Sequence, residues 1–64
     1  MKLLARFTKD DPPKLEMLNL ETGELLTVLE YHERCHCLYR AGEQFAKREG
    51  HELTEWDRTN LFTL

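Results

Sequence analysis

The chain of 64 residues lacks a long apolar run, and it lacks an excess of basic residues. No apolar stretch approaches the roughly 18 residues that span a bilayer. Arg6 and Lys9 interrupt the apolar start of the chain before the core of a secretory signal is complete. We therefore expect a cytoplasmic protein that does not enter a membrane.

The formal net charge is −3, from 9 Lys and Arg residues against 12 Asp and Glu residues. Non-specific binding to a phosphate backbone needs a basic surface, so we do not expect nucleic acid to be the main partner. Acidic residues are nevertheless concentrated before position 34 and basic residues after it: Glu21, Glu24, Glu30 and Glu33, then Arg34, Arg40, Lys47 and Arg48. A charge division of this kind favours docking to a protein.

Cysteine is scarce as well, with two residues in the chain. Cys35 and Cys37 flank a single residue, and on a helix their side chains would point about 200° apart, too far for a bridge within the chain. We expect both to be free thiols in a reducing compartment.

The length allows one domain, residues 1–64, which buries only about 60% of the surface that the unfolded chain exposes. A content of 41% hydrophobic and 33% charged residues is typical of a folded globular protein. Domains this small usually need a disulfide, a metal or a partner for stability.

Three stretches alternate with the period of a β-strand: residues 2–8, 14–20 and 24–30. Pro12 and Pro13 separate the first two stretches, and Gly23 provides a tight turn between the second and third. Thr27 and Glu30 have the spacing of a capping box, which would instead start a helix there. The phase argues against that alternative, because Leu29 would lie opposite Leu38.

Residues 31–49 have the period of an amphipathic helix that ends before Gly50. Gly42 lies on its apolar face, which indicates a close approach to a sheet. The predicted apolar face consists of Tyr31, Arg34, Cys35, Leu38, Ala41, Gly42 and Phe45.

Residues 51–56 are interpreted as a fourth strand returning beside the first, and the alternative is a short helix capped by Thr54. The structure of residues 59–64 is left open. The sequence thus predicts an α+β fold: a small antiparallel sheet of three to four strands with one amphipathic helix packed across it, in the order β-β-β-α-β.

His32, Cys35 and His36 share one border of the helix, where imidazole and thiolate groups can bind zinc, with Cys37 or His51 as a further ligand. Structural zinc sites usually have two separated ligand pairs, so we favour a buried Cys35 with solvated histidines and expect no cofactor.

Catalysis is not expected either, because a chain this short scarcely encloses a substrate pocket. A thiolate at Cys37 would need both a positioned base, such as His36 or His51, and a pocket. The carboxylates of Glu52, Glu55 and Asp57 are interpreted as a solvated acidic edge.

The second and third strands carry large apolar residues on both faces. The pattern assigns Leu15, Met17, Leu25 and Leu29 to one face, and Leu18, Leu20, Leu26 and Val28 to the other. One helix covers one face, whereas a solvated second face is normally polar. The second face must therefore meet the C-terminal residues Leu61, Phe62 and Leu64, a second copy of the chain, or another protein.

We predict a non-enzymatic protein-interaction module that regulates or inhibits a larger protein and is able to form a homodimer. Its size and layout are like those of small bacterial or phage proteins that inhibit a host protein, which is an analogy of architecture. The alternatives are a nucleic-acid-binding accessory protein that uses the basic helix border, and a small metal-dependent module. The candidate partner-binding residues are His36, Tyr39, Arg40, Glu43 and Lys47 on the helix, Leu18, Leu20 and Leu26 on the sheet, and Trp56.

Overall fold

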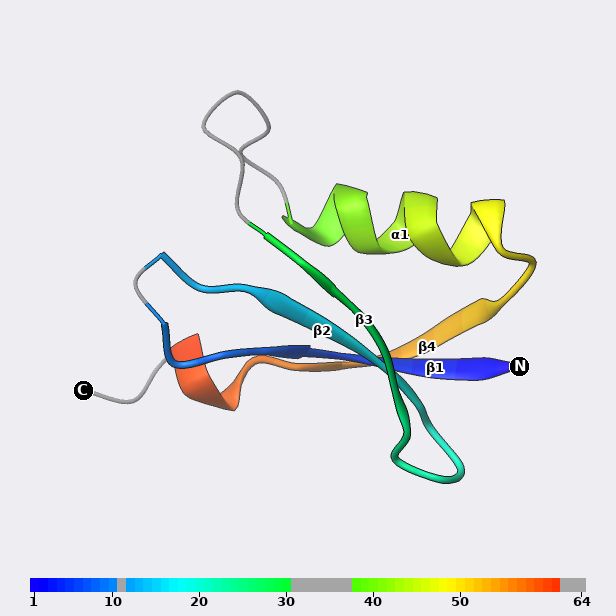
Figure 1. The fold of residues 1–64 in the computed structure, drawn as a ribbon, viewed down its shortest axis with the longest axis horizontal. Helices are drawn as coiled ribbons and strands as arrows, with labels where there is room; N and C mark the ends of the chain where they lie inside the picture. The colour runs from blue at the N-terminus through cyan, green and yellow to red at the C-terminus, as the bar shows by residue number, and fades with distance from the viewer. Residues whose placement is uncertain (11, 31–37, 62–64) are drawn as a thin grey trace.

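A computed structural model describes residues 1–10, 12–30 and 38–61, which form a four-stranded sheet with one helix packed across it (Figure 1). The predicted α+β class and the order β-β-β-α-β are confirmed. The elements are β1 (Lys2–Phe7), β2 (Leu15–Asn19), β3 (Leu25–Leu29), α1 (Leu38–Arg48), β4 (Glu52–Asp57) and the 3₁₀ helix η1 (Thr59–Leu61).

The strands lie side by side in the order β3-β2-β1-β4. β2 is antiparallel to both β1 and β3, as predicted, but β4 is parallel to β1, so the sheet is mixed. The parallel pairing arises because α1 returns the chain across the sheet after β3, and β4 then begins at the same end as β1. The alternative of a helix starting near Thr27 is wrong, because Leu25–Leu29 is a strand.

The hydrophobic core lies between α1 and the inner faces of β1 and β2. Leu3, Leu15 and Met17 have the largest side chains that are completely buried. Their spacing follows the two-residue alternation predicted for the first two strands. The other members of the core cluster are Ala5, Phe7, Leu38 and Ala46.

Gly42 sets the distance between α1 and the sheet. A Cβ atom at this position would lie 2.9 Å from Leu15 Cδ2 and 3.1 Å from Trp56 Cη2. Contacts this short leave no room for a methyl group, since the Leu15 side chain is itself fully buried. The expectation that Gly42 marks a close approach is confirmed.

The C-terminus of α1 is held by a pair of hydrogen bonds around Gly50, which has a φ of 73°. The His51 N–H donates to the Ala46 carbonyl at 2.8 Å, and the Gly50 N–H donates to the Lys47 carbonyl at 3.3 Å. This is the pattern of a Schellman motif, and it confirms the predicted stop at Gly50. Residues 31–37 of the predicted helix lie outside the described residues, and Tyr31, Arg34, Cys35 and Cys37 lie among them.

The buried face of α1 is centred on Leu38, Gly42 and Ala46. Ala41 and Phe45, predicted near the middle of this face, are only half-buried. The helix is thus rotated so that Tyr39 also packs against the core. The cause is an aromatic cluster formed with residues of β1 and β4, which is described below.

Membrane insertion finds no helical candidate here: α1 has 11 residues, and no helix within the described ranges has the length and apolar character needed to cross a bilayer.

We predict that Gly42→Ala destabilises the fold by about 1–3 kcal/mol, although alanine is the better helix former. The added methyl group overpacks Leu15 and Trp56, and this strain exceeds the gain in helix propensity. Urea denaturation followed by circular dichroism measures the effect. Gln44→Ala on the exposed side of α1 is the control, with an expected change within about 0.5 kcal/mol. A Gly42→Ala variant as stable as the parent would contradict the close approach.

Candidate interaction surface

The face of the sheet opposite α1 combines an apolar half with an acidic half. Figure 1 shows α1 on the other side of the sheet. Because paired residues of neighbouring strands point to the same face, the register assigns the residues of this uncovered face. They are Lys2, Leu4, Arg6, Glu16, Leu18, Leu20, Leu25, Val28, Glu52, Glu55 and Asp57.

The apolar half, here called the apolar patch, consists of Leu4, Leu18, Leu20, Leu25 and Val28. Leu18 is at its centre, paired with Leu4 on one side and with Leu25 on the other. Leu25 and Val28 are 48% and 40% exposed, whereas Leu18 is only 6% exposed. Leu18 is buried but does not belong to the core cluster under α1. The patch therefore has a closely packed centre and a solvent-exposed margin on β3.

The predicted positions of Leu25 and Leu26 are interchanged in the structure. Leu26 was expected on the uncovered face, but it packs against the core cluster on the helix side. Leu25 instead pairs with Leu18 and lies on the uncovered face. The cause is a register shift between Met17 and Leu18, which gives β3 one extra residue and reverses the alternation before it.

The remaining residues predicted for this surface, Leu18 and Leu20, do lie on the uncovered face. Leu4 and Leu25 also belong to it, and neither was among the predicted partner-binding residues. The alternation of residues 2–8 was a sufficient signal for Leu4, which points away from Leu3 and Ala5. No comparable signal exists for Leu25, because a bulge has no reliable sequence pattern.

Charged side chains continue the uncovered face from β2 to β4. Arg6 Nε donates a hydrogen bond to Glu16 Oε1 at 2.9 Å. Arg6 is also paired with Asp57, so it lies between two carboxylates. Glu52, Glu55 and Asp57 of β4 make the far side acidic, which confirms the acidic edge as a position but leaves its role open.

The pKa of the Asp57 carboxyl is held below its ordinary value of 3.8, mainly because the Thr59 N–H donates a hydrogen bond to Asp57 Oδ1 at 3.0 Å. The positive charge of Arg6 contributes in the same direction. This hydrogen bond starts η1, and Asn60 Nδ2 fixes η1 to the end of β1 by donating to the Phe7 carbonyl at 2.8 Å.

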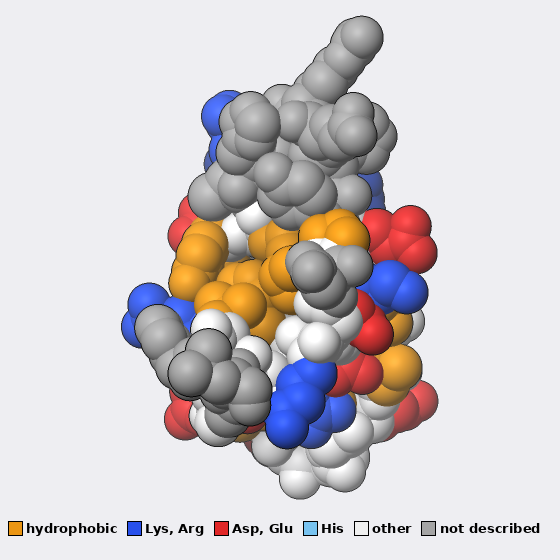
Figure 2. Space-filling view, turned by 90° about the vertical axis from the view of Figure 1, so that its left-hand side faces the viewer, with side chains coloured by type: hydrophobic (Ala, Val, Ile, Leu, Met, Phe, Trp, Pro, Cys, Tyr) orange, Lys and Arg blue, Asp and Glu red, His pale blue; other side chains and the backbone are white. Residues whose placement is uncertain are grey.

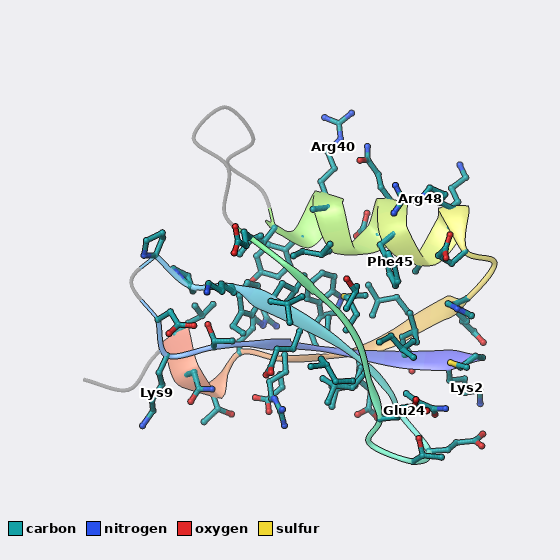
Figure 3. All side chains as sticks on the ribbon, viewed as in Figure 1. Lys2, Lys9, Glu24, Arg40, Phe45 and Arg48 are labelled. Carbon is teal, nitrogen blue, oxygen red and sulfur yellow. The ribbon has the colours of Figure 1, made fainter. Side chains whose placement is uncertain are left out.

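The outer side of α1 carries three of the predicted partner-binding residues, Arg40, Glu43 and Lys47, all exposed. Figure 3 shows Arg40 extending away from the sheet. Acidic groups lie among the basic ones, and Arg48 Nε is 3.8 Å from Glu49 Oε2. This surface is therefore polar and of mixed charge. His36 lies outside the described residues.

Tyr39 and Trp56 pack together with Phe7 in an aromatic cluster. The ring centroids of Tyr39 and Trp56 are 4.7 Å apart, and those of Phe7 and Tyr39 are 5.2 Å apart. The Arg58 guanidinium lies 6.0 Å from the Tyr39 ring. Figure 2 shows hydrophobic side chains gathered at this end of the molecule, where β1 ends and α1 begins. Both residues help to close the core, and their predicted contact with a partner stays a prediction.

The metal and catalytic hypotheses concern residues that are mostly outside the described part. His32, Cys35 and His36 fall in residues 31–37. Among the residues that the structure does describe, no group of three or more His, Cys, Asp and Glu side chains is arranged to hold a metal ion. His51 Nδ1 is buried, and no hydrogen-bond partner is found for it within the described ranges.

Comparison with protein families and known proteins adds no relative: no family model matches the chain, and neither does any curated protein or solved structure.

We predict that an NMR titration of the Asp57 carboxyl has a midpoint below 3.8, the ordinary value. Because the folded-state pKa is lowered, the associated stability is fully present above that ordinary value and is lost as the pH falls through the folded value. Asp57→Asn retains a side-chain oxygen for the Thr59 N–H but removes this part of the acid dependence. A midpoint at or above the ordinary value would contradict the assigned hydrogen bond.

Proposed function

We propose that this chain is a non-enzymatic protein-interaction module that binds a larger protein through the uncovered face of its sheet. The observation that carries the proposal is the apolar patch, with Leu25 and Val28 substantially exposed on the face opposite α1. Contiguous apolar surface on a small domain commonly marks a site of contact with another protein.

The acidic half of the uncovered face supports specific rather than general adhesion. Glu52, Glu55 and Asp57 follow one strand, and the apolar patch lies two strands away. A partner with an apolar area beside a basic one would match both halves in a single orientation. Charges of this kind mainly set orientation and association rate, while the apolar centre supplies most of the affinity.

In this proposal the chain regulates or inhibits its partner, as small phage or mobile-element proteins of similar layout do, because it offers a surface and no catalytic constellation in its described part. A homodimer through the same face is a further form of the proposal. Cys35 and Cys37, which a helix would hold apart, favour the cytoplasm as its compartment.

We predict that Leu25→Lys/Val28→Lys abolishes capture of the partner from an extract of the source cells by the tagged chain. The double substitution places charge in the apolar patch, and its cost in folding stability is small, at most about 1 kcal/mol, because both side chains are substantially exposed. Quantitative mass spectrometry of the captured proteins gives the readout, and circular dichroism verifies folding.

The matched control is Arg40→Glu/Lys47→Glu on the outer side of α1, which should leave capture unchanged. Capture that survives the patch variant but is lost in this control would reject the uncovered face as the binding surface. Loss of capture in the control, together with a steep salt dependence, would favour the nucleic-acid alternative. Sedimentation of the purified chain reports the homodimer separately.

A further inference from the structure

We infer that the outer edge of β3 binds an extended apolar segment of another protein, with Lys or Arg at both ends of that segment, as a fifth strand of the sheet. This inference rests on the proposed function and specifies how the partner docks. Leu25 and Val28 belong both to β3 and to the apolar patch, so a strand added at this edge would extend the uncovered face.

The two edges of the sheet differ in how they are protected. β4 carries Glu52, Glu55 and Asp57, and a register shift opposite β1 interrupts its pairing. β3 reads Leu-Leu-Thr-Val-Leu, without a charge or a proline. Charged residues and irregularities are the usual means of blocking strand addition, so β4 is blocked, while β3 lacks a blocking residue.

The backbone of β3 is available for pairing over its second half. Thr27, Val28 and Leu29 pair in regular register with β2, beyond the bulge at Leu26. Every second residue of an edge strand directs its N–H and C=O groups outward. Within the described residues, residues 25–29 make no backbone hydrogen bond outside the strand pairing. An added strand would satisfy these groups.

The charges at the two ends of β3 determine which kind of strand fits. Glu24 precedes β3 and Glu30 follows it, and both are exposed. Figure 3 shows Glu24 near the hairpin that joins β2 to β3. Lys14 Nζ lies 3.9 Å from Glu30 Oε1, with both side chains substantially exposed, so it screens this carboxylate only weakly. Both ends of the edge are therefore acidic.

This charge arrangement disfavours a second copy of the chain as the added strand. An antiparallel pairing of two β3 strands centred on Thr27 places Glu24 of each copy opposite Glu30 of the other. Like charges directly opposite destabilise a strand pair, whereas opposite charges stabilise it. A foreign segment with basic ends matches the same edge, and its apolar side chains would lie beside Leu25 and Val28.

The test is an NMR titration of the ¹⁵N-labelled full chain with the capped peptide Arg-Val-Thr-Val-Thr-Val-Arg. We expect the largest shifts in residues 25–29, and binding roughly tenfold weaker for the same peptide with Glu at both ends. A peptide N-methylated on alternate amides should not bind, because it lacks the hydrogen-bond donors for an added strand. No shift in β3, or equal affinity for the two charge forms, would overturn the inference.

Charge exchange in the chain itself provides the second arm. Glu24→Lys/Glu30→Lys should reverse the preference between the two peptides, and both sites are exposed, so folding is not at risk. Glu52→Lys/Glu55→Lys on β4 is the matched control and should leave the preference unchanged. A dimer of the parent chain with exchange-protected β3 amides would overturn the inference in favour of a second copy.

The outcomes also separate this inference from the proposed function. If Glu24→Lys/Glu30→Lys captures the cellular partner as well as the parent does, while Leu25→Lys/Val28→Lys does not, the edge inference fails and the proposed function stands. If the patch variant retains capture, the proposed function fails, and the peptide titration still reports on the edge alone.

Discussion

A single helix covers only one face of this sheet, and the rest of the structure follows from that constraint. α1 has 11 residues and packs directly onto the strands, with Gly42 allowing close contact with Leu15. This contact buries Leu3, Leu15 and Met17 completely. No second helix in the described part of the chain is available for the other face, so the apolar residues that alternate outward remain there.

The aromatic cluster and the mixed sheet have a common origin in the path of the chain across the sheet. α1 carries the chain from the β3 edge to the β4 edge, and β4 brings Trp56 beside Ala5 of β1. Trp56 then packs on Tyr39, which rotates the buried side of α1 away from the position expected from Leu38 alone. The core is thus closed by residues from both sides of the crossover.

Much of this fold could be predicted because its local signals agree. Two-residue alternation located β1 and β2, the 3.6-residue period located α1, and Gly50 marked its end. The exchange of Leu25 and Leu26 could not be predicted, since the bulge depends on pairing with β2 and leaves no pattern within residues 24–30. The salt bridge between Arg6 and Glu16 likewise joins two strands whose register the sequence does not specify. Within the candidate surface, Leu18 and Leu20 could be assigned from alternation alone.

The central claim is that the apolar patch faces solvent in the free chain. It is tested most directly by adding a soluble paramagnetic agent to methyl-labelled protein and measuring the relaxation of each leucine and valine methyl group. The structure predicts strong relaxation enhancement for Leu25 and Val28 and almost none for Leu3 and Leu15. Enhancement at Leu25 and Val28 as weak as in the core would contradict the account, because it would show that the chain itself covers the patch.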